Sequence, residues 1–236
     1  MPINYLNIEK GYAIFNGNEA NVVPHSHHAF EFFLNDTVSF DVVVENECLH
    51  NIKNILIAPD VTHEYLGNPK NYTIIFIDPE FININSFFNS SFKNLKNALE
   101  LDSLIKANNI SSDLLKKDLI TNLNKVRKPE NLLDSRIIKC LTSIEERLNN
   151  GPLSLDSFAK DVHLSTSRLY HLFKHETGIS IRRYILWSRL KKAIVGLKEG
   201  ESITNASYMG GFSDVAHFSR TFKKMFGVSP SSIFKD

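Results

Sequence analysis

The sequence FKHETGIS at residues 173–180 returns in altered form as FKKMFGVS at residues 222–229. Both copies follow the pattern F-K-x-x-x-G-x-S, and the second lies 49 positions after the first. A repeat at this spacing is typical of two copies of one supersecondary unit. The stretch from Leu153 to Phe234, which contains both copies, therefore decides how the C-terminal part of the chain folds.

The first copy predicts two short helices joined by a tight turn. Ser154 is a good N-cap for a helix with apolar residues on one face, and this helix is expected to end near His163. Ser165 is the N-cap candidate of the next helix, whose inward residues follow the i, i+3, i+4 spacing. Gly178 suits the left-handed residue that ends a helix.

The second copy repeats this arrangement. Ser202 is expected to cap its first helix, which the Gly210-Gly211 pair ends. Ser213 is expected to cap its second helix, and Gly227 to end it. Ser229-Pro230 predicts the start of one more short helix, because proline suits the first helical position. Between the two copies, residues 180–197 predict a connecting helix about 27 Å long.

A short helix, a tight turn and a second helix make a helix-turn-helix, in which the second helix enters the DNA major groove. The outward positions of both second helices carry hydrogen-bonding and cationic side chains, which contact base edges and phosphates. The predicted DNA-binding residues are Ser167, Arg168, Tyr170, His171, Lys174, Val215, Ala216, Ser219, Arg220 and Lys223. The alternative is that Arg168 and Arg220 form internal salt bridges, with Glu176 and Asp214 as partners, and that Lys223 is only solvated.

The run GFSDVAHFSRTFKKMFGVSP at residues 211–230 resembles the AraC/XylS family of transcription regulators, and further matching residues extend back to Leu155. The resemblance implies a sequence-specific regulator with two helix-turn-helix motifs, more commonly an activator than a repressor. It also implies double-stranded promoter DNA and RNA polymerase as partners, and base contacts from both second helices. Gly196 departs from the family, which has a better helix former there; glycine costs about 1 kcal/mol of helix propensity.

Composition and charge fit this interpretation. The chain has 236 residues and is 42% hydrophobic and 22% charged, as in ordinary globular proteins. Residues 1–129 have a net charge of −4 and residues 130–236 a net charge of +5, which suits a sensor joined to a nucleic-acid binder. No membrane span or signal peptide is evident. Cys48 and Cys140 are expected to be buried free thiols in a reducing cytoplasm.

Residues 1–79 predict β structure, because short apolar runs alternate with turn residues. Within them, His25, His27, Glu31 and the later His63 resemble the two signature motifs of cupin barrels. Three imidazoles and one carboxylate can hold a metal ion. The flanking glycines of metal-binding cupins are missing, however, and AraC-type regulators commonly carry such a barrel as a sensor without metal.

We therefore predict no metal and no cofactor. Instead, a small-molecule effector pocket is expected, with His25, His27, Phe30, Glu31 and His63 as its candidate ligand-binding residues. Phe32, Phe40 and Val42 are expected on the same inner strand faces. The alternative is that the histidines are structural residues that make polar contacts.

The predicted fold class is α+β. It comprises a cupin-like sensor barrel at residues 1–79, a helical connector or dimerisation region at 80–128, and a double helix-turn-helix domain at 129–236, with the linker near residues 127–130. The expected protein is a cytoplasmic, homodimeric regulator and not an enzyme. Two rivals remain: a metal-dependent cupin enzyme with an attached DNA-binding module, and an activator that needs no effector.

Overall fold

The computed structural model describes residues 3–9, 11–17, 22–35, 37–67, 69–80, 97–107, 111–123, 133–150 and 153–234. It divides into two compact units. The first unit contains Met1–Arg127 together with Ser219–Asp236, and the second contains Lys128–Phe218. The predicted linker at residues 127–130 and the Asn-rich stretch at 83–94 lie outside the described residues, and the predicted three-part division stays a prediction.

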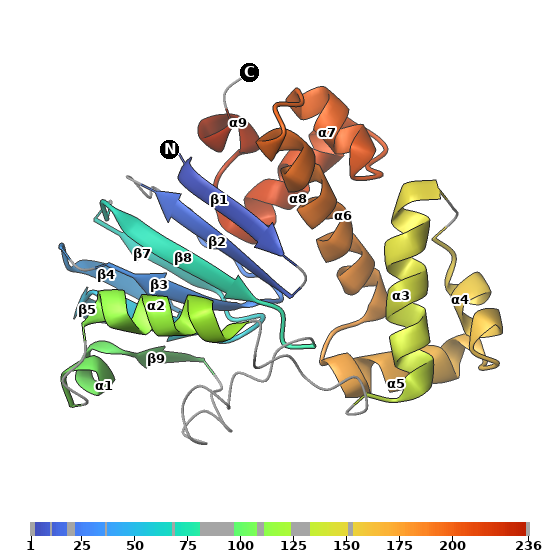
Figure 1. The fold of residues 1–236 in the computed structure, drawn as a ribbon, viewed down its shortest axis with the longest axis horizontal. Helices are drawn as coiled ribbons and strands as arrows, with labels where there is room; N and C mark the ends of the chain where they lie inside the picture. Colours follow the sequence, from blue (N-terminus) through green and yellow to red (C-terminus); the bar gives the residue numbers. More distant parts are fainter. Residues whose placement is uncertain are drawn as a thin grey trace. The chain divides into compact units, whose positions relative to one another are not determined.

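The first unit is built on two antiparallel sheets (Figure 1). The larger sheet has six strands, in the order β1 (Ile3–Glu9), β2 (Tyr12–Gly17), β8 (Tyr72–Ile77), β3 (Phe30–Leu34), β6 (Asn54–Ile57) and β9 (Ala98–Glu100). The smaller sheet has three, in the order β5 (Glu47–Ile52), β4 (Phe40–Val44) and β7 (His63–Leu66). The predicted β-rich N-terminal part is confirmed. Its described strands form two sheets rather than a closed barrel, because no strand ladder joins the two sheets.

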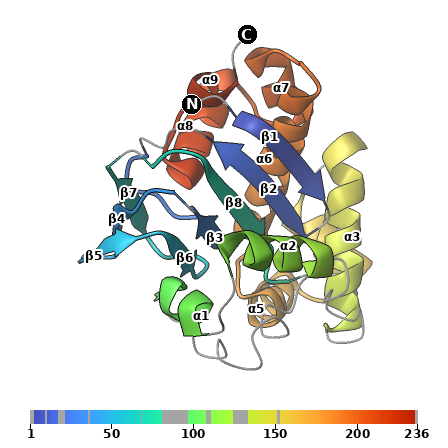
Figure 2. The same ribbon diagram turned by 60° about the vertical axis from the view of Figure 1, so that its left-hand side comes forward.

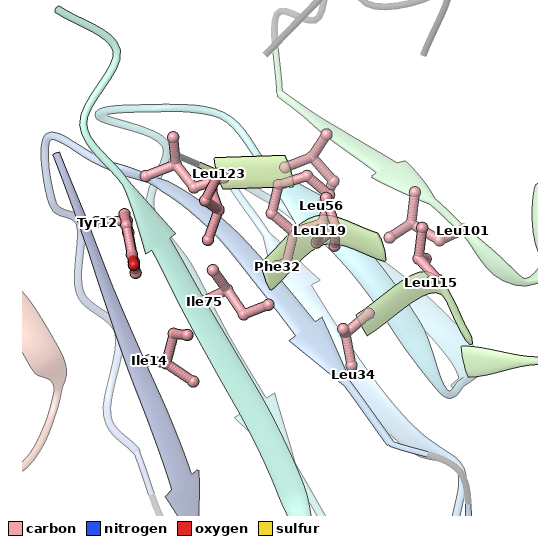
Figure 3. Packing of buried hydrophobic residues seen from close by; sticks show 11 residues of the cluster. Tyr12, Ile14, Phe32, Leu34, Leu56, Ile75, Leu101, Leu115, Leu119 and Leu123 are labelled. Carbon is pink, nitrogen blue, oxygen red and sulfur yellow. The ribbon is translucent and has the colours of Figure 1, made fainter. Parts of the chain in front are cut away.

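One face of the six-stranded sheet is covered by α2 (Ser112–Leu123), which follows the short helix α1 (Asp102–Ala107) (Figure 2). Side chains alternate across a strand, so every second residue of β3 points to this face. Phe32 and Leu34 of β3 lie there in one buried apolar cluster with Leu115, Leu119 and Leu123 of α2 (Figure 3). Phe30 is half-buried against the same apolar cluster.

The side chains of Glu31 and Phe33, the remaining residues of β3, point to the opposite face of the sheet. Phe33 is fully buried among aromatic rings, with centroid distances of 4.4 Å to Tyr65, 4.7 Å to Phe40 and 4.8 Å to Tyr72. Aromatic pairs at such distances add to the stabilisation from buried area alone. This face is therefore a second core, and it surrounds the carboxylate of Glu31.

Residues 219–234 complete the first unit beside this second face. The ring of Phe226 lies 5.7 Å from that of Phe76 and 6.4 Å from that of Phe15. The backbone N–H of Val23 donates a hydrogen bond of 3.1 Å to the carbonyl of Gly227. Gly227 has φ 70°, and a Cβ there would lie 2.6 Å from the carbonyl oxygen of Val23. Glycine is therefore required by both the backbone conformation and the close approach.

The second unit is helical. Its elements are α3 (Ser135–Asn150), α4 (Leu155–Asp161), α5 (Thr166–Thr177), α6 (Ile181–Lys198), α7 (Ile203–Met209) and the first residues of α8 (Val215–Phe226). The helix α9 (Pro230–Ile233) follows in the first unit. The predicted pairs α4–α5 and α7–α8 are confirmed, as is the connecting helix α6.

Local capping explains why these helices begin and end where they do. The hydroxyls of Ser165, Ser180 and Ser202 accept hydrogen bonds from backbone N–H groups three residues on. Gly178 ends α5 with φ 78°, as predicted. The prediction for α8 was wrong by one residue: a carboxylate oxygen of Asp214 accepts the N–H of His217 at 2.7 Å, so Asp214 rather than Ser213 caps this helix.

Two glycines allow close helix packing in the second unit. A Cβ on Gly210 would lie 2.7 Å from the carbonyl oxygen of Arg189 and 2.9 Å from the Cβ of Ala193, both on α6. A Cβ on Gly196 would lie 3.2 Å from the sulfur of Met209 on α7. The helix-weakening Gly196 thus lies where α6 and α7 come close.

The two cysteines differ in environment. Cys140 on α3 is buried, and burial together with the nearby Asp161 carboxylate raises the pKa of its thiol to about 12. Cys48 on β5 is exposed, so its predicted burial is wrong: β5 is a strand at the edge of the smaller sheet. Within the described part of the chain, no helix combines the length and the apolar character that a membrane crossing demands.

We expect Leu119→Ala to lower the free energy of unfolding by about 2–5 kcal/mol, since the truncation leaves a cavity between α2 and the sheet. Leu114→Ala is the matched control, because Leu114 lies on the same helix with 51% of its surface exposed. Its expected effect is within about 0.5 kcal/mol. Urea unfolding followed by circular dichroism measures both. Equal losses for the two variants would contradict the burial of this face of α2.

In the native protein, iodoacetamide should modify Cys48 and spare Cys140, because the thiolate is the reactive form and the buried thiol of Cys140 stays protonated. Mass spectrometry of peptides gives the sites. Cys48→Ser should abolish labelling of the folded chain, and urea should expose Cys140. Labelling of both cysteines at one rate in the native protein would show that α3 is not packed as described.

Candidate nucleic-acid interface and buried histidine cluster

The helix α5 presents the first set of predicted DNA-binding residues. The packing of Leu169 and Phe173, both fully buried, fixes which side of the helix faces inward. The opposite side is exposed along its whole length, and it contains all five predicted residues: Ser167, Arg168, Tyr170, His171 and Lys174. The sequence therefore predicted this exposed face correctly, whereas their contact with DNA stays a prediction.

Hydrogen bonds at both ends hold α5 in place. At its start, Ser165 caps the N–H of Arg168, and the hydroxyl of Thr166 donates 2.9 Å to a carboxylate oxygen of Asp156 on α4. At its end, the buried hydroxyl of Thr177 donates 2.7 Å to the carbonyl of Phe173. Of these bonds, the one from Thr166 joins α5 to α4 and so helps to fix the orientation of the exposed face relative to α4, as a helix-turn-helix requires.

The helix α8 presents the second set less openly. Ala216, Arg220 and Lys223 are exposed, whereas Val215 and Ser219 are half-buried. Apolar side chains such as Val215 and Ala216 offer only van der Waals contact, for example to a thymine methyl group. Fewer polar groups are therefore available for base contacts on α8 than on α5.

The proposed salt bridges of the two arginines are not found. Among the described residues, no ion pair involves Arg168 or Arg220. Glu176 instead pairs with His175 at 3.0 Å and accepts the backbone N–H of Asp134. Both guanidinium groups are exposed and available for a phosphate or a base.

In the first unit, the structure brings together His25, His27, Glu31 and His63, and all four are buried. Each offers a ligand atom, and these atoms all lie within 4.8 Å of one another. His25 and His63 form an isolated antiparallel bridge through two backbone hydrogen bonds of 3.0 and 2.9 Å. Glu31 reaches the cluster from β3.

Phe30 is not part of this cluster. The alternation of β3 places it on the face covered by α2, opposite to Glu31. Phe32 lies on that same α2 face, so only Phe40 and Val42 of the predicted lining residues are on the smaller sheet. A ligand-binding role for Phe30 stays a prediction, and the structure gives it no neighbour among the histidines.

The carboxylate of Glu31 is the centre of the cluster. Its Oε2 lies 2.6 Å from Nε2 of His27 and 3.2 Å from Nε2 of His63. The hydroxyl of Tyr65 donates to its Oε1 at 2.5 Å. Burial alone would raise the pKa of Glu31, but the hydrogen bonds from His27 and His63 hold it well below the ordinary value. The carboxylate is therefore ionised at neutral pH.

The histidines respond to burial in the opposite sense. Burial, with a further contribution from His63, lowers the pKa of His25 to about 3. Burial also lowers the pKa of His27, despite the attraction of Glu31. Desolvation raises the pKa of Tyr65 well above its ordinary value, and the adjacent Glu31 carboxylate adds to this effect. Tyr65 thus remains a hydrogen-bond donor, and the charge of the cluster is concentrated on Glu31.

Sequence reasoning missed two partners. Tyr65 contacts Glu31 from a different sheet, and His28 pairs with Glu80 at 2.8 Å across 52 positions of sequence. Both residues of the second pair are buried. His28 follows His27 directly in the sequence, but no local pattern identifies a partner so distant as Glu80.

A cavity of about 50 Å³ adjoins the cluster within the first unit. His25, Glu31, Tyr65 and Tyr72 contribute its polar lining, and its apolar lining includes Phe222 and Phe226 of α8. Pockets for drug-sized ligands usually measure about 300–1,000 Å³. In this conformation the cavity accommodates a few water molecules or a very small group.

Comparison with known proteins identifies the helical part. The family described as "Helix-turn-helix domain" matches residues 158–236. The Msm operon regulatory protein of Streptococcus mutans is 41% identical over 85 residues, 36% of this chain and 31% of that protein. The transcriptional activator RhaS of Escherichia coli is 34% identical over 126 residues, 52% of this chain and 45% of that protein.

The chain carries an AraC/XylS-type helix-turn-helix domain. The predicted family resemblance is thereby confirmed. This AraC/XylS-type domain contains both repeats of the F-K-x-x-x-G-x-S pattern. The named relatives are regulators and activators of transcription, and the matches span less than half of each relative's own length.

The fold likeness extends beyond the AraC/XylS-type domain. The structure of ToxT from Vibrio cholerae O395 matches with a TM-score of 0.56 and 17% identity, and covers 95% of this chain and 97% of that chain. A second ToxT structure, whose description reports a bound unsaturated fatty acid, matches with a TM-score of 0.54 and 16% identity, over 96% of this chain and 95% of that chain. The likeness confirms a sheet-rich N-terminal part followed by a helical part.

We expect His171→Ala to weaken discrimination between a bound DNA site and its single-base variants by about 1–3 kcal/mol, because an exposed imidazole on α5 can contact a base edge. His175→Ala is the matched control: its side chain is 82% exposed on the same helix but pairs with Glu176. Competition binding with labelled duplexes measures both. Unchanged sequence preference in His171→Ala would exclude His171 from base recognition.

Proposed function

We propose that this protein is a sequence-specific transcription regulator that binds double-stranded promoter DNA through α5 and α8. The observation that carries the proposal is the exposed face of α5, where five hydrogen-bonding or cationic side chains stand on a helix fixed by caps at both ends. The match to the helix-turn-helix family over residues 158–236 supports the same function. Activation through recruitment of RNA polymerase is proposed because RhaS and RhrA are named activators.

Within this function the two helices have different tasks. Tyr170 and His171 on α5 supply directional hydrogen bonds, which distinguish base pairs in the major groove. Arg168 and Lys174 are positioned for phosphates, which orient a protein on the duplex without reading its sequence. On α8, Val215 and Ala216 supply apolar contacts, whereas Arg220 and Lys223 supply charge. We therefore assign most of the sequence discrimination to α5.

The first unit is proposed to sense an effector and to form a homodimer. The buried cluster beside a cavity supports the sensing role, since convergent polar groups in an apolar surround are typical of binding sites. The cavity lining contains neither lysine nor arginine among the described residues, so a carboxylate ligand such as the fatty acid of the ToxT structure finds no cationic partner there.

The proposed regulator is cytoplasmic and not an enzyme. Its named relatives act in transcription, and promoter DNA and RNA polymerase are in the bacterial cytoplasm. The exposed thiol of Cys48 suits a reducing compartment. The ionised Glu31 and the buried imidazoles serve as binding groups in this proposal rather than as catalysts.

Selection of bound duplexes from a random library by the full-length chain tests the function. The selected site should retard in a gel at low salt, and affinity should fall steeply as salt rises. Lys174→Ala and Lys223→Ala should each weaken binding to all sequences alike, and each should reduce the slope of log K against log salt by about 1.

Lys198→Ala is the control for these variants, because Lys198 is an exposed cation in the last turn of α6 and is not one of the predicted DNA-binding residues. It should leave affinity and salt slope unchanged. If no selected or promoter duplex is retarded at low salt, the proposed function fails. In vitro transcription from the selected promoter then separates activation from repression.

A further inference from the structure

We propose that His25, His27, His63 and Glu31 bind one divalent first-row transition-metal ion. The sequence favoured a sensor without metal, but the spacing of residues does not reveal how the four donors are oriented. The inference goes beyond the proposed regulatory function, since a metal ion can be measured on the protein whether or not DNA is bound.

The four donors come from separate segments and converge in the interior. His25 and His27 precede β3, Glu31 lies in β3 and His63 begins β7. The residues are 1–5% exposed, and their ligand atoms lie within 4.8 Å of one another. Two donors that each lie about 2.1 Å from one ion are at most about 4.2 Å apart. Closing the cluster around an ion therefore requires movements below about 1 Å.

Backbone carbonyls fix which nitrogen of each imidazole faces the centre. Nδ1 of His25 lies 3.1 Å from the carbonyl of Val23, Nδ1 of His27 lies 2.9 Å from that of Ala29, and Nδ1 of His63 lies 3.0 Å from that of Val61. A carbonyl only accepts, so each Nδ1 carries the proton and donates it. The Nε2 atoms of His27 and His63 face Glu31, where each can carry a proton for the carboxylate or, once that proton is lost, offer a lone pair to a metal ion.

This arrangement is the one that metal-binding histidines use. A metal-bound imidazole almost always donates its other N–H to a carbonyl or carboxylate, which sets its tautomer and its orientation. All three histidines of the cluster are anchored in this way, on three different carbonyls.

The charge of the cluster also calls for a cation. Oε2 of Glu31 faces the Nε2 atoms of His27 and His63 at 2.6 and 3.2 Å, while Oε1 is satisfied by the hydroxyl of Tyr65. A carboxylate oxygen and an imidazole nitrogen approach to 2.6 Å only with a proton or a metal ion shared between them, and buried anions require compensation. Among the described residues, no lysine or arginine pairs with Glu31. The rival compensation is a proton on a histidine, which the experiment below distinguishes.

The donor set selects the class of ion. Imidazole nitrogens suit zinc, copper, iron and nickel, whereas magnesium and calcium prefer oxygen ligands throughout. His25 and Glu31 also line the adjoining cavity, so the site is not closed on that side. The cavity leaves room for a water ligand.

A second group of possible ligands lies elsewhere and serves as a control. Asp41, Cys48 and His50 are on the smaller sheet, and Cys48 and His50 are exposed. Asp41 already pairs with His50 at 3.0 Å. Exposed groups of this kind bind metals weakly, so the double variant C48A/H50A removes this source of background.

The test uses the full-length protein, stripped with a chelator and dialysed against Zn²⁺ or Co²⁺ with excess Mg²⁺. Elemental analysis should find about one ion per chain in the wild type and in C48A/H50A. Glu31→Gln preserves the size of the side chain but removes its charge, and His63→Gln removes one imidazole. Each should weaken the affinity at least about 10-fold, as even the loss of an outer hydrogen-bond partner can. Bound Co²⁺ should show the same visible absorption of tetrahedral type in the wild type and in C48A/H50A, and this absorption should be altered or lost in E31Q and H63Q.

Each other outcome overturns the proposal. A wild-type chain that retains no stoichiometric metal shows that a proton compensates Glu31. The metal lies outside the cluster if wild type, E31Q and H63Q retain equal amounts of it. The same conclusion follows if only C48A/H50A loses the metal. The metal content of the wild-type protein tests the proposal even if E31Q or H63Q fails to fold. Because the readout is metal content, it is independent of the DNA-binding test of the proposed function.

Discussion

The carboxylate of Glu31, buried in an otherwise apolar strand, is the constraint that organises the first unit. An ionised group without water is costly unless hydrogen bonds and opposite charge surround it. The chain meets this requirement with partners from both sheets: His27 just before β3, and His63 and Tyr65 on β7. The two sheets are therefore joined by polar contacts at one place and by aromatic packing elsewhere.

The strict alternation of β3 makes this possible. Phe32 and Leu34 bury against α2, and a shift of one residue would place Glu31 in that apolar core instead. The register of β3 against its neighbours is thus set twice, by apolar burial on one face and by the carboxylate on the other. Strands specified in this way resist slippage, which keeps the four donors of the cluster in place.

The helical part could be predicted well from the sequence because its determinants are local. Ser165, Ser202 and Gly178 act within a few residues of their own positions, and the repeated pattern by itself marks the second helix of each motif. The error of Ser213 for Asp214 arose because both residues are good caps and lie side by side, and Ser154 stands at the N-cap position of α4 without a side-chain cap bond. Whether Arg168 and Arg220 form ion pairs also lay beyond the sequence, since that depends on the orientation of exposed side chains.

The first unit was predicted only in outline, because its determinants are distant in sequence. The histidines and Glu31 were recognised from spacing, but Tyr65 and the pair of His28 with Glu80 depend on strand order. Phe30 was assigned to the histidine face, although the alternation that includes Glu31 places it on the α2 face. The exposure of Cys48 likewise follows from the edge position of β5, which no local pattern reveals.

Ser219–Asp236 belong to the first unit, although the whole second unit separates them from Arg127 in the sequence. A ribosome therefore releases the strands of both sheets long before Phe222, Phe226 and Gly227 exist. Until then, the sheet surface around Phe15 and Phe76 has no cover, and nascent chains with such surfaces are prone to aggregate. The cover of this sheet surface is consequently supplied by residues that are made only after the whole second unit.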